Sequence, residues 1–116
     1  MATDPKQAES AEDPVYIESD QHLEDVVTTN DVVLVDFFAD WCGPCQMIEP
    51  ILEQLARETD AVIAKVDVDQ HQALAGSFGV RGVPTLLLYA DGEQVEQHVG
   101  AMSGDQLRTL IDRYTN

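Results

Sequence analysis

The sequence predicts one α/β domain in which a mixed five-stranded sheet is flanked by four helices. Apolar runs of strand length alternate with helical periodicities in the order strand, helix, strand, helix, strand, helix, strand, strand, helix. Helices separate the early strands, which are therefore predicted to be parallel, whereas the hairpin signal Asp91-Gly92 makes the last two antiparallel. A chain of 116 residues is long enough to bury one hydrophobic core.

Residues 1–14 differ in composition from the rest of the chain. They are mainly small and acidic residues with two prolines, and they hold too few apolar side chains to order themselves. We therefore predict a disordered acidic N-terminal tail over residues 1–14 and a folded domain over residues 15–116.

The first half of the domain is predicted to contain two strands and two helices. A short strand over 15–18 precedes a helix over 19–29, which Ser19 or Asp20 can cap. Residues 31–39 form a nearly continuous apolar run, which predicts a strand buried on both faces with the carboxylate of Asp36 in its middle. Apolar residues at helical spacing then predict a helix over 42–59.

The second half adds three strands and two helices. A strand is predicted over 61–69, followed by a short helix over 70–79 that Asp69 can cap. The hairpin strands lie within 83–99, and Ser103 with Gln106 forms a capping box at the start of the last helix.

The net charge of −16 argues against several classes of partner. An acidic surface repels the phosphates of nucleic acids and anionic lipids, so we expect neither nucleic acid nor a membrane as a partner. No apolar stretch approaches the roughly 20 residues that a transmembrane helix needs, and the first residues do not have the pattern of a signal peptide. We therefore expect a cytoplasmic protein.

The net charge of −16 also indicates the kind of solution in which the protein works. Self-repulsion of this size destabilises a compact state unless salt screens it. We interpret the acidity as halophilic adaptation to a salt-rich cytoplasm, and an ordinary acidic protein that its charge keeps soluble is the alternative.

The two cysteines of the chain, Cys42 and Cys45, stand at the start of a predicted helix in the segment ADWCGPCQM. The N–H groups and the dipole of a helix N-terminus favour a thiolate on Cys42, which would attack a disulfide. Cys45, one turn further along, would resolve the mixed disulfide. Gly43 leaves room for a substrate backbone, and Pro44 suits the first helical turn.

Other roles for the cysteines are weaker interpretations. A permanent structural disulfide is disfavoured in a reducing cytosol. A structural zinc site usually takes four protein ligands, whereas this chain has no second cysteine pair and its three histidines fall on different predicted elements. A zinc ion shared between two chains and inert core cysteines are further alternatives, and we expect neither a metal nor a cofactor.

Several motifs occur in an order and spacing that resemble the thioredoxin family. They are VDFFADWCGPC, the lysine of AKVDVDQ, RGVPTLLLYADGE and VGAMS, and the resemblance covers about residues 15–116. It implies a thioredoxin fold and a thiol-disulfide oxidoreductase, namely a protein-disulfide reductase that cycles Cys42 and Cys45 between dithiol and disulfide.

The resemblance assigns roles to further residues. Asp36 matches a buried aspartate that assists proton transfer at the second cysteine, and burial should raise its pKa. Lys65 matches a lysine near that aspartate, and Pro84 matches a cis-proline beside the dithiol. Purely structural roles are the alternatives for these residues. The implied docking surface for substrates consists of Trp41, Gly43, Pro44, Val83, Pro84, Gly100 and Ala101.

Three residues depart from the family pattern. Gln46 stands where a lysine commonly follows the second cysteine, and Asp40 precedes Trp41. Both make the surroundings of Cys42 more negative, which should raise the pKa of its thiol and slow its attack. Phe38 stands where tryptophan is frequent, and we expect its packing to change while its role survives.

The resemblance also implies partners. A monomer without a cofactor of its own would need thioredoxin reductase or an equivalent electron donor, and would act on client proteins with exposed disulfides. An oxidant or isomerase of the same fold is one alternative, which the uncharged Gly43-Pro44 pair argues against. A non-redox binding subunit is the other.

Overall fold

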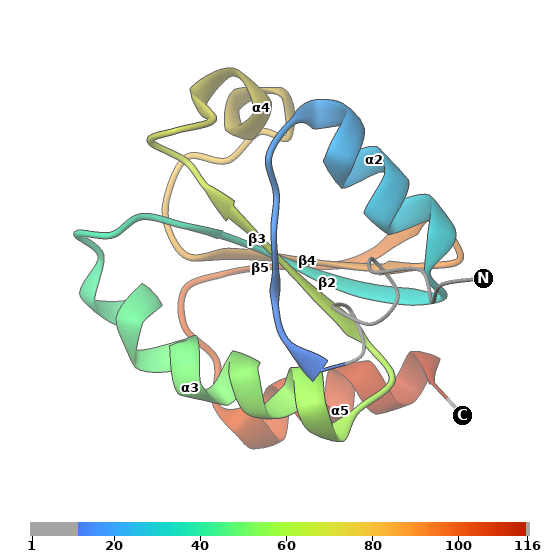
Figure 1. The fold of residues 1–116 in the computed structure, drawn as a ribbon. Coiled ribbons are helices and arrows are strands. Elements are labelled where there is room, and N and C mark those ends of the chain that lie inside the picture. Colours follow the sequence, from blue (N-terminus) through green and yellow to red (C-terminus); the bar gives the residue numbers. More distant parts are fainter. Residues whose placement is uncertain (1–11, 116) are drawn as a thin grey trace.

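The computed structural model describes residues 12–115 and confirms the predicted order of elements within them (Figure 1). The strands are β1 (Val15–Tyr16), β2 (Val32–Phe38), β3 (Val62–Asp67), β4 (Thr85–Ala90) and β5 (Glu93–Val99). The helices are α2 (Asp20–Thr29), α3 (Gly43–Glu58), α4 (Gln72–Ser77) and α5 (Gly104–Tyr114). Most of the predicted acidic tail, residues 1–11, lies outside the described residues, so the tail and its boundary stay predictions.

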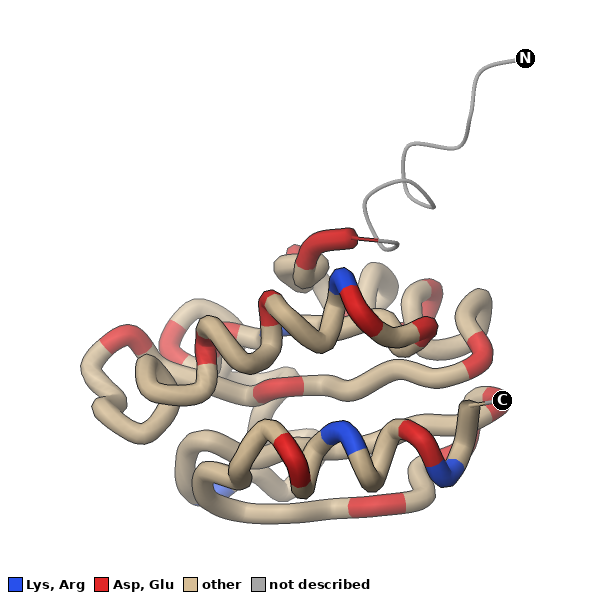
Figure 2. Tube along the Cα trace, turned by 90° about the horizontal axis from the view of Figure 1, so that it is seen from below, with Lys and Arg blue, Asp and Glu red and all other residues tan. Residues whose placement is uncertain are grey.

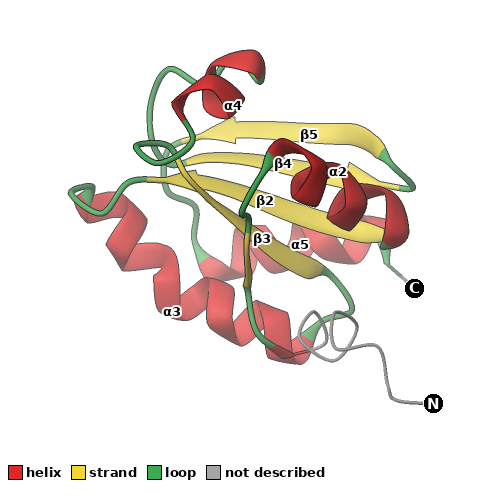
Figure 3. Cartoon of the chain, turned by 45° about the horizontal axis from the view of Figure 1, so that its top comes forward, coloured by secondary structure: helices red, strands yellow, loops and turns green. Residues whose placement is uncertain are grey.

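The five strands form one mixed sheet, as the sequence predicts, and their order in the sheet is β1-β3-β2-β4-β5. Strands β1, β3 and β2 are parallel, and β4 runs antiparallel to both β2 and β5. Helices α2 and α4 cover one face of the sheet, and α3 and α5 cover the other (Figures 1 and 3). None of the helices within residues 12–115 is long and apolar enough to cross a membrane.

Strand β2 is buried on both faces, and its side chains alternate between two cores. Val33 and Val35 pack in the core under α2 and α4, whereas Val32 and Leu34 pack in the core under α3 and α5. Because side chains alternate with a period of two along a strand, Asp36 belongs with the second set. The carboxylate in this apolar strand is therefore directed toward α3.

Helix and turn signals in the sequence are mostly confirmed. The Ser19 hydroxyl accepts the N–H of His22 at 3.0 Å and caps α2. Ser103 and Gln106 form the predicted capping box, with reciprocal hydrogen bonds of 3.0 and 3.1 Å. Asp91 and Gly92 both have positive φ, as the favoured two-residue hairpin turn requires.

The predicted cap of the short helix is wrong. Helix α4 begins at Gln72, so its N-cap residue is His71, and the His71 side chain makes no capping hydrogen bond. Strand β3 ends at Asp67, whose carboxylate accepts the N–H of Asp69 at 2.9 Å and turns the chain before the helix starts. Asp69 instead receives a hydrogen bond from Trp41, described below.

Candidate active site

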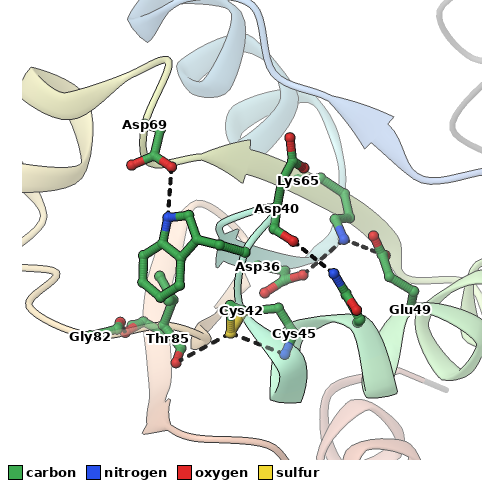
Figure 4. Close-up of a disulfide and its surroundings, with 12 residues drawn as sticks. Asp36, Asp40, Cys42, Cys45, Glu49, Lys65, Asp69, Gly82 and Thr85 are labelled. Carbon is green, nitrogen blue, oxygen red and sulfur yellow. Dashed lines mark hydrogen bonds and ion pairs between the residues drawn. A yellow bond between two sulfur atoms is a disulfide. The ribbon is translucent and has the colours of Figure 1, made fainter.

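Cys42 and Cys45 form a disulfide at the N-terminal end of α3 (Figure 4). Cys42 is the N-cap residue and Cys45 lies in the first turn, and their Cα atoms are 5.2 Å apart. The backbone N–H of Cys45 donates a hydrogen bond to Cys42 Sγ at 3.1 Å. The sulfur of Cys42 therefore takes the place of a capping oxygen, where the helix N-terminus stabilises negative charge.

Burial does not distinguish the two cysteines. Cys42 is 4% exposed and Cys45 is 2% exposed, and both pack with Phe38, Ala39 and Val83. The two cysteines differ in their places at the helix N-terminus, because the Cys42 sulfur accepts a hydrogen bond from a helical N–H group and the Cys45 backbone donates it.

The two residues between the cysteines are exposed. Pro44 occupies the first turn of α3, where a missing N–H costs no helical hydrogen bond. A Cβ atom added to Gly43 would meet no atom within 4 Å, so packing inside the chain does not require a glycine at this position.

Asp36 and Lys65 are directly opposite each other on the parallel strands β2 and β3. Both side chains are fully buried, and Lys65 Nζ lies 3.1 Å from Asp36 Oδ2 as an ion pair. Among the described residues, 12–115, this ion pair is the polar contact of the Asp36 carboxylate, and neither of its oxygens has a partner at hydrogen-bond geometry. Burial raises the pKa of Asp36 to about 6, and the positive charge of Lys65 limits the rise.

Lys65 also binds a second carboxylate, which is not among the site residues predicted from the sequence. Its ammonium group forms an ion pair with Glu49 of α3 (Figure 4). The centroid of the Phe38 ring lies 4.2 Å from Lys65 Nζ, and the centroid of the Tyr16 ring lies 5.9 Å from the same atom. Phe38 thus contributes a cation–π contact as well as packing. The spacing of four between Cys45 and Glu49 in a predicted helix is the signal that could have placed Glu49 near the dithiol.

The peptide bond between Val83 and Pro84 is cis, as expected, and lies beside the disulfide. The carbonyl oxygen of Val83 is 3.7 Å from Cys42 Sγ. The N–H of Gly100 donates to the carbonyl oxygen of Pro84 at 2.8 Å, which joins the two predicted docking loops. Gly100 has a φ of 101°, a conformation that favours glycine, and the neighbouring Ala101 is exposed.

Apolar side chains are exposed around this end of the molecule. Trp41 is 71% exposed, and its indole Nε1–H donates to Asp69 Oδ2 at 2.9 Å (Figure 4). Val99 is also exposed and lies opposite Thr85 in the hairpin, next to Pro84. Met47 is exposed in the first half of α3. Val99 and Met47 are not among the residues of the docking surface that the sequence predicts.

Acidic residues are distributed over both helical layers and the loops, and they outnumber the basic ones (Figure 2). Near the disulfide, Asp40 is exposed, and the side-chain amide of Gln46 donates to the Asp40 carbonyl oxygen at 2.7 Å. Gln46 therefore fixes the loop before Cys42 without adding positive charge.

The histidines do not form a metal site with the cysteines in the part of the chain that is described. His22 lies in α2, His71 precedes α4 and His98 lies in β5. Within residues 12–115, no group of three His, Cys, Asp or Glu side chains is placed to hold a metal ion.

Comparisons with known proteins agree with this geometry. The sequence model of the thioredoxin family matches residues 13–113. The thioredoxin of Bacillus subtilis is 47% identical over 89 residues, which cover 75% of this chain and 86% of that protein. The thioredoxin of Chlamydia muridarum is 46% identical over 101 residues, which cover 86% of this chain and 98% of that protein.

A solved structure is similar as well. A point mutant of the thioredoxin from Halobacterium salinarum is 59% identical and superposes with a TM-score of 0.89, covering 92% of this chain and 95% of that one. The family model and the similar structure thus match the same part of the chain, and this part contains the Cys42–Cys45 disulfide. The chain therefore belongs to the thioredoxin family and is a thiol-disulfide oxidoreductase of the protein-disulfide reductase type.

Proposed function

We propose that Cys42 is the attacking thiolate and Cys45 the resolving thiol in the reduction of exposed disulfides on client proteins. The single observation that carries this assignment is the hydrogen bond from the Cys45 N–H to Cys42 Sγ at the start of α3. A sulfur in this position is stabilised as an anion by the helix N-terminus, and a thiolate is the nucleophile in disulfide exchange.

The reaction runs in two exchanges. The Cys42 thiolate attacks one sulfur of the client disulfide, a mixed disulfide forms, and the other client sulfur leaves as a thiolate. Cys45 then loses its proton and attacks Cys42 Sγ, which releases the second client sulfur and forms the Cys42–Cys45 disulfide. Two electrons pass from the dithiol to the client, and its two thiolates take up protons.

Asp36 is the proposed acceptor of the Cys45 proton. Its pKa of about 6 lies near neutral pH, where a carboxylate is ionised and still basic enough to take a proton. Lys65 pairs with the carboxylate and moderates its basicity. In Figure 4 the Asp36 carboxylate is drawn between Lys65 and the disulfide.

The proposed docking surface surrounds the disulfide. The open space at Gly43 and the exposure of Pro44 leave room for a client backbone. The backbone of Val83, next to the cis bond, can pair with an extended client segment. The remaining members of the surface are Trp41, Pro84, Gly100 and Ala101.

The oxidised pair must be reduced again after each cycle. We propose thioredoxin reductase, a flavin-dependent enzyme in this family's pathway, or an equivalent donor as the source of electrons. We further propose that the protein acts as a monomer in a cytoplasm rich in salt. The net charge of −16 supports the salt adaptation, since salt screens the repulsion between acidic groups.

An equilibrium redox titration in molar KCl tests the direction of electron flow. The Cys42–Cys45 pair is equilibrated with defined dithiol and disulfide buffers, and its state is followed through the fluorescence of Trp41, the one tryptophan. A reduction potential clearly below that of a glutathione pool supports the reductase. A potential well above it identifies an oxidant or isomerase and overturns the proposal.

A second experiment separates electron transfer from simple binding. The double variant Cys42→Ser, Cys45→Ser loses disulfide reduction while keeping its fold, which circular dichroism checks. If cells that carry only this variant keep the protein's physiological function, the chain serves as a non-redox binding subunit.

A further inference from the structure

The ammonium group of Lys65 is shared between two carboxylates of unequal exposure. The side chains of Lys65 and Asp36 are fully buried, whereas the side chain of Glu49 is 31% exposed. Asp36 comes from strand β2, Lys65 from β3 and Glu49 from helix α3. One cation therefore meets two anions at the layer between the sheet and α3.

The fold brings these three groups together for simple geometric reasons. The register of β2 and β3 places Asp36 opposite Lys65, and both side chains are directed toward α3. Cys45 and Ile48 belong to the buried face of α3, and Glu49 follows Cys45 by one turn at the edge of that face. Glu49 thus reaches the Lys65 ammonium group from the opposite side of the layer.

The charges around this cluster do not balance. Facing the Lys65 ammonium group are the carboxylates of Asp36 of β2 and Glu49 of α3 and the ring of Tyr16 of β1. The carboxylate of Glu53, further along α3, also raises the pKa of Tyr16. The pKa of Tyr16 is raised, first by burial and then by the negative charge of Glu49. Glu49 also raises the pKa of Asp36, after the larger effects of burial and Lys65.

We propose that Glu49 is a positioning residue that competes with Asp36 for the Lys65 ammonium group and so keeps Asp36 basic enough to accept the Cys45 proton. The inference rests on the proposed role of Asp36. A Lys65 that paired with Asp36 alone would favour the ionised carboxylate more strongly and make it a weaker base. By binding the same ammonium group, Glu49 weakens the stabilisation that Lys65 gives to the ionised Asp36 carboxylate. Because the Glu49 side chain is partly exposed, its own charge costs little desolvation energy.

The chemical step that benefits is the resolution of the mixed disulfide. The Cys45 thiol gives its proton to the Asp36 carboxylate as Cys45 Sγ attacks Cys42 Sγ. The bond between Cys42 and the client sulfur breaks, and the client sulfur leaves with the electron pair as a thiolate. The Asp36 carboxylic acid then returns the proton to the thiolate or to water.

The Asp36 titration in the oxidised protein tests the proposal directly. In that state the cysteines do not titrate, so the carboxyl carbon of Asp36, followed by NMR, reports its own pKa without coupling to a thiol. In Glu49→Gln we expect the Asp36 pKa to fall by about one unit, because a like charge close to the carboxyl group is removed and Lys65 is released to it. An unchanged or raised Asp36 pKa overturns the proposal.

Two further variants separate competition for Lys65 from general charge effects. Glu53→Gln removes the same charge one turn further along α3, from an exposed residue without an ion pair to Lys65, and should change the Asp36 pKa much less. In a Lys65→Met background, the effect of Glu49→Gln should shrink to less than half. If Glu49→Gln lowers the Asp36 pKa equally in the Lys65→Met background, Glu49 acts by direct repulsion of the Asp36 carboxylate, and competition for Lys65 is refuted.

A kinetic measurement connects the cluster to the reaction. The acidic limb of the pH profile for client disulfide reduction should move to lower pH in Glu49→Gln by the same shift as the Asp36 pKa, and Glu49→Asp should largely restore it. A shifted Asp36 pKa with an unmoved acidic limb would refute a role for Glu49 in the reaction. If the double cysteine variant shows that reduction is not the function, the NMR result still decides whether Glu49 controls Asp36.

Discussion

Trp41 and Asp69 are joined by a hydrogen bond across 28 residues of sequence, from the indole Nε1–H to Oδ2 at 2.9 Å. Trp41 is exposed, so little packing holds its ring in one orientation. The hydrogen bond gives the ring a fixed orientation beside the disulfide. It uses the carboxylate of Asp69, which the sequence predicts as a helix cap.

Removing the acceptor should weaken client binding. Asp69→Ala leaves the indole N–H without a partner, and we expect kcat/KM for a protein disulfide to fall by about threefold to tenfold, the value of one ordinary hydrogen bond. Asp69→Asn keeps an acceptor oxygen and should retain most of the activity. Reduction of a small aromatic disulfide, which should not need the proposed docking surface, serves as the control. An equal loss with both substrates would mean that Asp69 supports the chemistry instead.

Buried Asp36 should make stability depend on pH. Burial raises the pKa of its carboxyl group from 3.8 to about 6, so the folded state holds the proton more tightly than the unfolded chain. The free energy of unfolding should therefore fall as pH rises from about 4 to about 6, and the full cost, roughly 3 kcal/mol, persists at higher pH.

The measurement is urea unfolding of the oxidised protein in molar KCl, because guanidinium chloride would itself screen the acidic surface. Wild type and Asp36→Asn are compared at several pH values. The stability of Asp36→Asn relative to wild type should increase between pH 4 and pH 6 and then stay constant. A difference that does not change with pH would contradict the raised pKa.

The charge next to Cys42 should control the rate of attack. Gln46→Lys adds a cation one residue after Cys45, which should lower the pKa of the Cys42 thiol and speed its alkylation by iodoacetamide below pH 7. Screening should reduce this gain in molar KCl relative to dilute buffer. Asp40→Asn is the matched variant, since it changes the net charge by the same amount nearby. If neither variant changes the alkylation rate, the helix N-terminus, and not these nearby charges, controls the pKa of the Cys42 thiol.

Salt should stabilise the whole fold. At 1 M salt the Debye length is about 3 Å, so repulsion within a chain of net charge −16 is largely screened. We expect the melting temperature to rise by at least about 5 °C between dilute buffer and molar KCl, which corresponds to about 1 kcal/mol. NaCl at the same ionic strength should give a similar rise. A melting temperature that does not rise would contradict the adaptation to salt.

The sequence predicts the framework of this site better than its polar contacts. Strand and helix periods place Asp36 in a buried strand and the cysteines at a helix N-terminus, because both follow from local patterns. The ion pair between Lys65 and Glu49 depends on how α3 lies across β3, which no local pattern contains. Asp69 was assigned to a cap because capping is local, whereas its actual partner, Trp41, belongs to another element.

The burial of Lys65 also affects how the protein responds to reagents. Lys65 is the one lysine between residues 12 and 115, and its side chain is fully enclosed. Acylating reagents and proteases that cleave after lysine can therefore reach this residue only when β3 separates from α3. The rate at which Lys65 is labelled thus reports how often the folded domain opens, and the rate of cleavage after Lys65 reports how often it unfolds.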